Sequence, residues 1–393
     1  MRSNEWKKYL IQDVGKVITG RTPAGTLDEY FGGKTLFVTP SDMKEQKYIK
    51  NTERTLSILG EDKVNNIIFE CGIVVSCIGW QMGKAAIVRQ KAATNQQINT
   101  IIVDNSIANI DFLYYVLKLK REEIFQLGIT ATRTPIVKKT LFEKIPFFAP
   151  NLIEQKKIAS ILSALDAKIE LNNRINAELE AMAKTLYDYW FVQFDFPDQN
   201  GKPYKSSGGK MVYNPTLKRE IPEGWEVGQL GDLLELHYGK SLKRSVRSGF
   251  GYPVVGSSGI IGYHSEYLIK APSIVLGRKG TLGQITYLSE NFFPIDTTYY
   301  VNPKINIGFS FLYYLLLSID FKKMNTDSAV PGLNRDNALG YKILIPPLKL
   351  IQSFEKFSNT IFTKKAQKQN QQLTQLRDWL LPMLMNGQIK IKK

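Results

Sequence analysis

A run of 41 residues without glycine or proline, from Asn151 to Phe191, constrains the fold more than any other part of the sequence. Glycine and proline are the residues that most often interrupt helices, so this run predicts one long helix. At a rise of 1.5 Å per residue, such a helix would be about 60 Å long. Glu154 follows Asn151 at the spacing of a capping box, which places the beginning of the helix at Asn151.

Apolar residues recur every seven positions along this helix, a spacing typical of coiled coils. The first series contains Ile158, Leu165, Leu179 and Leu186, with the polar Asn172 in the same register. We place a second series three residues further on, at Ile161, Ile175, Met182 and Tyr189. One helix cannot bury this surface alone, so the pattern predicts a partner helix.

The predicted partner is the stretch from Pro346 to Gly387, which matches the first stretch at a constant offset of 197 residues. At equivalent heptad positions Leu165, Asn172, Leu179 and Leu186 correspond to Phe362, Gln369, Leu376 and Met383. We predict that these residues pair the helices in an antiparallel coiled coil, in which the buried polar pair fixes the register. The alternative is two unrelated helices that each pack on their own domain.

The segments outside the helices are also duplicated. Trp6, Asp13 and Gly20 recur 219 residues later as Trp225, Asp232 and Gly239. Two β-branched runs broken by glycines each predict a buried strand, a turn and a second strand; they are Gly72 to Val88 and Ser273 to Leu288. The letters FLYY occur at 112–115 and again at 311–314, each opening a short amphipathic helix.

The sequence therefore predicts an α/β (α+β) fold with an internal pseudo-twofold duplication. Two similar mixed α/β domains are separated by two long helices that form an antiparallel coiled coil. The predicted segments are the first domain (1–150), the first long helix (151–192), a linker rich in Gly, Pro, Ser and Lys (193–219), the second domain (220–347), the second long helix (348–387) and a basic tail (388–393).

Charge and hydropathy narrow the class of protein. The formal net charge is +16 and the excess is spread over several segments, which favours a large polyanion as partner. No apolar run approaches the 18 residues of a membrane span, and the N-terminal residues lack a signal-peptide core. We therefore expect a cytoplasmic protein without a membrane partner. Cys71 and Cys77 lie in one apolar run and are expected to be reduced core residues.

Two similar domains at the ends of paired helices would hold two copies of one surface a fixed distance apart. Duplex DNA rises about 3.4 Å per base pair, so a rod of this length would reach beyond one helical turn. The expected target is a bipartite, non-palindromic DNA site.

Over its whole length the sequence resembles the specificity subunits of type I restriction-modification systems. The resemblance rests on the duplicated layout, on LIEQKKIASILSALDAKIELNNRINAELEAM in the first long helix and on GKMVYNPTLKREIPEGWEVGQL in the linker. It implies two target recognition domains that each read half of a split site, and helices that set the spacer and dock two adenine methyltransferase (M) subunits. Restriction/translocase (R) subunits then join that core.

The resemblance also implies a non-catalytic chain without cofactors, with S-adenosylmethionine, ATP and Mg²⁺ expected on the partner subunits. The residues agree, because the adenine-methylation motif [ND]-P-P-[YF] does not occur and no P-loop is complete. We accordingly expect no catalytic, cofactor-binding or metal site. Two alternatives stay open: a coiled-coil scaffold without sequence-specific DNA binding, and a metal-dependent nuclease, which would need clustered acids.

Candidate DNA contacts are polar and basic residues in loops beside the repeated strands, because Arg, Lys, Asn and Gln read base edges and exposed cations contact phosphates. Two basic windows, 124–142 and 236–265, contain no acidic residue. The candidates are Arg21, Thr22, Trp80, Gln81, Gln96, Gln97, Arg133 and Lys138 in the first domain, and Lys240, Lys243, Arg244, Arg247, Arg278 and Lys279 in the second. For each of them the alternative is a solvated surface residue.

Aromatic residues could also stack on bases. We interpret Tyr114, Tyr115, Tyr313 and Tyr314 as core residues because they lie in duplicated apolar frames, and we treat Trp80, beside a glycine turn, as the exception. The pairs at 190–191 and 379–380, both beginning with Trp, are either docking surfaces for a partner or the end of the helix seam.

Overall fold

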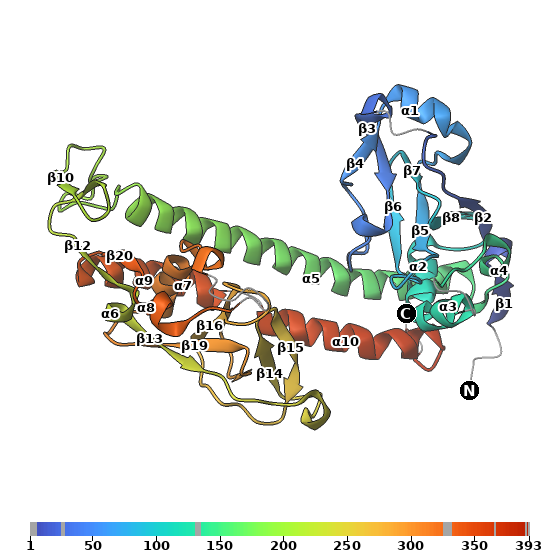
Figure 1. The fold of residues 1–393 in the computed structure, drawn as a ribbon. Helices are drawn as coiled ribbons and strands as arrows, with labels where there is room; N and C mark the ends of the chain where they lie inside the picture. The colour runs from blue at the N-terminus through green and yellow to red at the C-terminus, as the bar shows by residue number, and fades with distance from the viewer. Residues whose placement is uncertain are drawn as a thin grey trace. The chain divides into compact units, whose positions relative to one another are not determined.

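The computed structural model describes residues 6–24, 28–129, 135–324, 332–364, 367–389 and 391. The chain divides into two compact units (Figure 1): unit 1 comprises Met1–Arg174 and Ala366–Lys393, and unit 2 comprises Ile175–Lys365. Among the described residues, no helix has the length and apolar character needed to cross a membrane.

The predicted first long helix is confirmed. Helix α5 (Leu152–Tyr187) contains 36 residues, continues as a π-helical turn over Asp188–Val192, and contributes residues to both units. Asn151 caps it as expected, because the Asn151 Oδ1 accepts a hydrogen bond of 3.0 Å from the backbone N–H of Glu154.

Unit 1 contains two main sheets and a short strand pair. The strand order of the four-stranded antiparallel sheet is β2 (Gly15–Thr19), β8 (Ile98–Val103), β5 (Gly72–Ser76) and β6 (Ala85–Val88). The three-stranded sheet contains β4 (Arg54–Leu56), β3 (Phe31–Val38) and β7 (Ala92–Thr94), with β3 and β7 parallel. Strand β1 (Lys7–Leu10) pairs with β9 (Pro146–Ala149). The helices of this domain are α1 (Ile58–Lys63), α2 (Ile110–Leu119), α3 (Arg121–Gly128) and α4 (Lys139–Phe142).

Unit 2 repeats this topology strand for strand. Its four-stranded sheet has the order β13 (Leu234–Tyr238), β19 (Thr298–Pro303), β16 (Ser273–Gly277) and β17 (Ile285–Leu288). Its three-stranded sheet contains β15 (Gly259–His264), β14 (Tyr252–Gly256) and β18 (Phe293–Pro294), with β14 and β18 parallel. Strand β12 (Glu226–Gln229) pairs with β20 (Lys342–Ile345). The predicted duplication of a mixed α/β domain is therefore confirmed.

The remaining elements of unit 2 are helical, apart from one hairpin in the linker. The helices are α6 (Leu230–Leu233), α7 (Phe309–Leu317), α8 (Arg335–Leu339) and α9 (Leu348–Lys364). In the linker, β10 (Met211–Asn214) pairs with β11 (Arg219–Pro222). The second long stretch continues in unit 1 as α10 (Gln367–Met385).

The core of each domain is completed by the long helices. In unit 1, Ile158 and Leu162 of α5 and Leu384 of α10 are buried in one cluster with Phe112 of α2. In unit 2, Phe191 lies at the end of α5, and its ring is 5.0 Å from Phe311 of α7 and 5.3 Å from Phe354 of α9. The two copies of the FLYY sequence thus open the helices that pack on the long helices.

The prediction that a second buried series lies three residues after the first along α5 is wrong. Residues four positions after the first series are buried or half-buried, and they include Leu162, Ala183 and Trp190. Residues three positions after it are mostly exposed, and the side chain of Met182 is 62% exposed. Both series contain apolar residues, so periodicity alone could not choose between them, and the neighbouring elements decide which is buried.

Helices α5 and α10 run antiparallel within unit 1. The Asn172 side-chain amide donates hydrogen bonds of 2.9 Å to Gln369 Oε1 and 2.8 Å to Asn370 Oδ1. Asp166, earlier on α5, pairs at 2.9 Å with Arg377, later on α10. The structure therefore brings the two polar positions, Asn172 and Gln369, into contact.

The other residues proposed for helix pairing are placed unevenly. Leu165, Leu179, Leu186 and Met383 are half-buried, whereas Leu376 is exposed and Leu373 and Arg377 beside it are half-buried. The side chain of Phe362 lies outside the described part of the chain.

One expectation for the cysteines is also wrong. Cys77 is buried, but Cys71 is exposed, because it lies in the bend before β5 and not within the strand.

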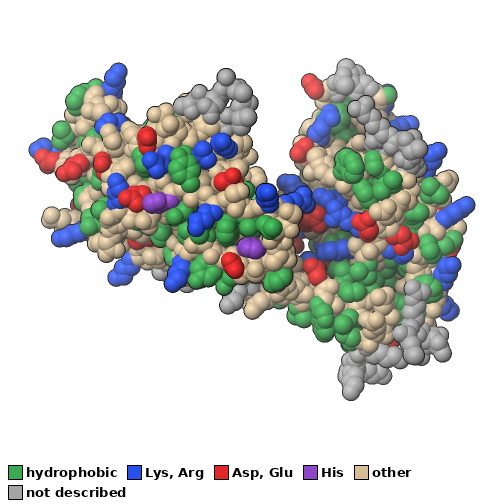
Figure 2. All heavy atoms as spheres, turned by 60° about the horizontal axis from the view of Figure 1, so that its bottom comes forward, with side chains coloured by type: hydrophobic (Ala, Val, Ile, Leu, Met, Phe, Trp, Pro, Cys, Tyr) green, Lys and Arg blue, Asp and Glu red, His purple; other side chains and the backbone are tan. Residues whose placement is uncertain are grey.

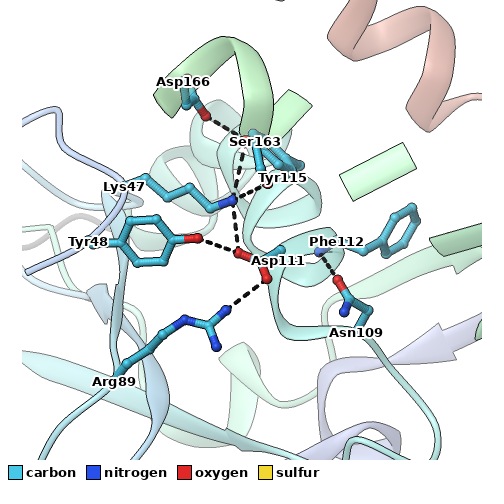
Figure 3. Close-up of polar contacts among 9 residues, drawn as sticks. All are labelled: Lys47, Tyr48, Arg89, Asn109, Asp111, Phe112, Tyr115, Ser163 and Asp166. Atoms are coloured by element: carbon cyan, nitrogen blue, oxygen red, sulfur yellow. Dashed lines mark hydrogen bonds and ion pairs between the residues drawn. The ribbon is translucent and has the colours of Figure 1, made fainter. Parts of the chain in front are cut away.

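A polar cluster joins the first domain to α5 in unit 1 (Figure 3). The Lys47 Nζ lies 2.9 Å from Asp111 Oδ1 and donates a hydrogen bond of 2.6 Å to Ser163 Oγ on α5. Arg89 lies 2.8 Å from the other carboxylate oxygen of Asp111. Burial lowers the pKa of Lys47. For Asp111, burial would raise the pKa, but hydrogen bonds and nearby positive charge outweigh burial and lower it.

A buried carboxylate occupies the comparable contact of unit 2. Glu355 on α9 accepts hydrogen bonds of 2.6 Å from the Phe311 backbone N–H and from Ser310 Oγ at the start of α7. Burial raises the pKa of Glu355, and the hydrogen bonds oppose this only in part.

We predict that Phe354→Ala lowers the free energy of unfolding of unit 2 by about 3–5 kcal/mol, because it leaves a cavity among aromatic rings. Urea unfolding followed by tyrosine and tryptophan fluorescence measures this destabilisation. Phe357→Ala, on the same helix but exposed, is the matched control. Equal destabilisation of the two variants would contradict the packing described here.

We also predict a pH-dependent effect for Glu355→Gln. A carboxyl whose pKa is raised by folding stabilises the fold below its unfolded pKa, and this contribution is lost as the pH rises through the folded pKa. Glutamine retains an acceptor for the Phe311 N–H but cannot ionise, so the stability of the variant relative to the native chain should increase from pH 4 upwards. Denaturant unfolding between about pH 4 and 8 checks this, with Glu290→Gln as the exposed control. A difference independent of pH would contradict it.

Candidate nucleic-acid interface

Four loops of unit 1 meet at one end of the four-stranded sheet. Three of these loops follow the strands β2, β5 and β7, and the fourth precedes helix α4. The Arg21 N–H donates to the Thr94 carbonyl at 2.9 Å, the Cys77 N–H to the Gln97 carbonyl at 2.8 Å, and the Gly79 N–H to the Pro135 carbonyl at 2.9 Å. These bonds bring together loops that are far apart in the sequence and that carry most first-domain candidates.

The side chains on these loops are mainly neutral and polar or aromatic. Thr22 Oγ1 donates a hydrogen bond of 2.8 Å to Gln96 Oε1, and Gln97 Oε1 accepts one of 3.1 Å from the Asn95 amide. Trp80 is 82% exposed, and its ring lies 6.0 Å from that of Phe125. These residues form a surface suited to the amide and apolar contacts that read A·T pairs.

The remaining first-domain candidates are Gln81, Lys138, Arg21 and Arg133. Gln81 and Lys138 are exposed. Arg21 is also exposed, but its guanidinium donates a hydrogen bond to the Lys63 carbonyl. Arg133 lies outside the described residues.

A buried polar contact supports the loops from below. Thr19 Oγ1 donates to Asn99 Oδ1 at 2.7 Å, and the Asn99 amide donates to Cys77 Sγ at 3.2 Å. Burial raises the pKa of the Cys77 thiol to about 12, so the sulfur stays protonated at neutral pH. Cys77 therefore has a structural role.

Unit 2 builds the same loop arrangement with different side chains. The Lys240 N–H donates to the Pro294 carbonyl at 3.0 Å, as Arg21 does to Thr94. The Leu333 N–H donates to the Arg278 carbonyl at 3.0 Å, and in unit 1 the Val137 N–H donates to the Cys77 carbonyl at 2.9 Å. Arg278 and Lys279 therefore occupy the places of Cys77 and Ile78.

Arg278 is held in place by its neighbours. Its Nη1 donates to the Asp296 carbonyl at 3.1 Å, and its guanidinium lies 4.8 Å from the ring centre of Tyr238. Arg335, at the start of α8, lies 5.8 Å from the same ring. Lys279 and Lys240 are exposed beside them. At the places of Cys77 and Ile78, this surface is therefore cationic where that of unit 1 is neutral.

Arg335 does not stand out in the sequence, because Asp336 follows it directly and it therefore lies outside the basic windows without acidic residues. The hydrogen bonds of Val137 and Leu333 align Arg335 with Lys139, at the same place in the duplicated loops. An alignment of the two halves across these loops is the signal that could have identified it.

Unit 2 has further basic residues in the loop between β13 and β14. Arg247 is half-buried and donates hydrogen bonds of 3.1 Å to the carbonyls of Leu242 and Ile261, so it holds the loop together. Lys243 and Arg244 are exposed at a 3₁₀ turn over Arg244–Val246. Figure 2 shows a face of unit 2 on which Lys and Arg side chains lie near the two histidines.

The duplicated tyrosines lie in the cores, as predicted. Tyr114, Tyr115 and Tyr314 are buried and Tyr313 is half-buried. Trp190 and Phe191 are buried in unit 2, whereas Trp379 is exposed. In the described part of the chain, no three His, Cys, Asp or Glu side chains gather in a way that could hold a metal ion.

Comparison with known proteins identifies one family. The family model described as "Type I restriction modification DNA specificity domain" matches residues 3–181 and 222–375. The chain is 27% identical over 420 residues to the type I restriction enzyme MjaIX specificity subunit of Methanocaldococcus jannaschii, covering 99% of this chain and 94% of that relative. It is 24% identical to the HindI specificity subunit of Haemophilus influenzae, covering 98% of this chain and all of that relative (100%).

A solved structure supports the fold. The crystal structure of a type I restriction-modification S subunit from M. genitalium has a TM-score of 0.62 to this chain at 23% identity. The match covers 98% of this chain and 97% of the other.

We predict that replacing Lys243 and Arg244 together by Ala weakens binding to all duplex sequences alike. Removing one phosphate contact should reduce the slope of log K against log salt by about 0.9, so removing both should reduce it by almost 2. Fluorescence anisotropy titrations at several salt concentrations measure this change. Lys202→Ala with Lys349→Ala, two exposed lysines elsewhere in unit 2, is the control. A changed base preference with an unchanged slope would make Lys243 and Arg244 base readers instead.

Proposed function

The chain belongs to the type I restriction-modification DNA specificity family, and from this premise we propose that it is the DNA-reading, non-catalytic subunit of such a complex. The observation that carries the proposal is the loop arrangement that occurs once in each unit on the same strand topology. A duplicated scaffold with different loop side chains suits two related surfaces that read different sequences.

Each loop surface would read one half of a split site. In unit 1, Gln96, Gln97 and Trp80 offer amide and aromatic groups. In unit 2, Arg278, Lys279 and Arg335 offer positively charged donors. Gln pairs best with adenine and Arg with guanine in the major groove, so the half-sites differ and the whole site is not a palindrome.

The long helices would set the spacer between the half-sites. Helix α5 is continuous from Leu152 to Tyr187 and supplies core residues to both units. A change in its length would therefore change where each domain is attached along one helix.

Chemistry would come from the partners of the chain. Two adenine methyltransferase subunits bind S-adenosylmethionine and methylate the site, and restriction/translocase subunits use ATP and Mg²⁺. Binding to double-stranded DNA and assembly in the cytoplasm belong to the same proposal. The positive net charge of +16 supports a polyanionic partner.

Insertion of one heptad into each long helix tests this function. Seven residues add about 10 Å of helix and preserve its buried face. Duplex DNA covers this length in about 3 base pairs. We predict a spacer longer by that amount with both half-sites unchanged, measured by mapping methylated adenines in cells that express the variant and the methyltransferase. A changed half-site with the original spacer would contradict the proposal.

A further inference from the structure

A basic pocket lies at the edge of the four-stranded sheet of unit 1, at the end where the reading loops gather. Strand β6 is an edge strand of that sheet, and its first residue, Ala85, lines the pocket. Ala85 pairs with Val75 near the end of β5, so it lies where the loop that carries Trp80 leaves the sheet. The basic pocket has a volume of about 150 Å³, and its charged lining residues are Lys44, Glu45, Lys84, Lys118 and Arg121.

The four cations of the basic pocket come from separate parts of the domain. Lys44 lies after β3 and Lys84 directly precedes β6. Lys118 lies in the last turn of α2, and Arg121 begins α3. Gly83 lets α3 approach the β5–β6 turn, because its φ is +80° and a Cβ there would lie 2.6 Å from the Arg121 carbonyl oxygen. The fold therefore gathers positive charges that are far apart in the sequence.

This positive charge is only partly neutralised within unit 1. The Glu45 Oε1 lies 3.6 Å from Lys84 Nζ and 3.5 Å from Arg121 Nη1, and the Glu45 side chain is 74% exposed. Exposed ion pairs at such distances are weak. In the part of the chain that the structure describes, Lys44 and Lys118 have no carboxylate within ion-pairing distance. The pocket therefore has positive charge available for an anion.

Lys118 lies in an environment that favours a bound anion. Its side chain is half-buried, and burial lowers its pKa, with a further contribution from the positive charge of Arg377. The nearby carboxylate of Asp166 is engaged by Arg377 at 2.9 Å. An anion beside the Lys118 ammonium would offset both effects, because an opposite charge stabilises the charged form.

The position of the basic pocket points to a phosphate of the DNA backbone as this anion. The pocket lies beside the turn that carries Trp80, and the Trp80 ring lies 6.0 Å from that of Phe125 on α3, the helix that Arg121 begins. The basic pocket and the reading loops thus share the β5–β6 turn and α3. Lysine and arginine side chains bind backbone phosphates, which border the groove in which bases are read.

Unit 2 has uncharged residues at two of the four cationic positions. The N–H of the last residue of β16 donates to the Gln284 carbonyl at 2.8 Å, as the last residue of β5 donates to the Lys84 carbonyl at 2.9 Å. The FLYY repeat aligns Leu317 with Lys118. A cationic site that differs between the copies suits one half of an asymmetric DNA site better than a protein partner that meets both units alike.

We propose that the basic pocket binds one backbone phosphate of duplex DNA beside the half-site read by unit 1, with Lys118 and Arg121 as donors. The inference rests on the function proposed above. A phosphate contact carries no sequence information, but it fixes the register of a domain on the duplex. The basic pocket is therefore a positioning site, separate from the loops that read bases.

A scan with neutral methylphosphonates, placed one at a time along the duplex, tests this assignment. Fluorescence anisotropy measures binding of the full chain, in complex with its methyltransferase, to a duplex that contains its mapped site. The scan is repeated with Lys118→Gln combined with Arg121→Gln, and with Lys44→Gln as a second variant at an exposed position. The matched control is Lys8→Gln combined with Lys16→Gln, at two exposed lysines of unit 1 outside the pocket. Circular dichroism checks folding.

One methylphosphonate beside one half-site should weaken binding of the native complex and of the control about 10-fold, as for the loss of a charged hydrogen bond. On the double variant it should have no further effect, because the contact is already absent. The double variant should bind the unmodified duplex about 10-fold more weakly, with the slope of log K against log salt reduced by about 0.9 and the methylated motif unchanged. Lys44→Gln should give a smaller change in the same direction.

Two results would overturn the assignment. One is that the double variant and every methylphosphonate weaken binding independently of each other. The other is that a folded variant loses its methyltransferase, which would make the basic pocket a site for an acidic segment of a protein. If the native complex binds its mapped duplex no better than an unrelated one, the proposed function itself fails, and this result is distinct from the other two.

Discussion

The structure depends on the burial of two domain faces against one helix. Helix α2 of the first domain and α7 of the second each present aromatic residues that need a partner surface, and α5 supplies part of that surface in both units. The second long stretch completes each core, through α10 in unit 1 and α9 in unit 2. One helix therefore contributes residues to the cores of both units.

The two units use different contacts to hold the domain against the long helices. In unit 1, a network that includes Lys47, Asp111 and Ser163 adds directional contacts between the domain and α5. In unit 2, aromatic rings in edge-to-face contact and the buried Glu355 do so. Charged groups inside a protein are costly unless they are paired, so removing one partner of the Lys47–Asp111 pair should destabilise unit 1.

Much of this architecture could be predicted because the sequence contains it twice. The repeated tryptophan, glycine and FLYY positions identified the duplicated domain, and the run without glycine or proline identified α5 and its cap at Asn151. The buried face of α5 could not be predicted, because apolar residues occur both three and four positions after the first heptad series. Only the surrounding domain selects Ala183 over Met182. The roles of individual site residues were more difficult to predict. Arg247 donates hydrogen bonds within its own loop, which its basic character alone does not indicate. Arg335 was not selected because the acidic Asp336 follows it in the sequence.

Whether this chain reads DNA is decided by a map of adenine methylation in cells that express it with its methyltransferase, compared with cells that express the methyltransferase alone. Methylation should occur at one split, non-palindromic motif and only when both proteins are present. Methylation at the same motifs with and without the chain, while the two proteins still copurify, would show that the chain is a scaffold and does not read DNA.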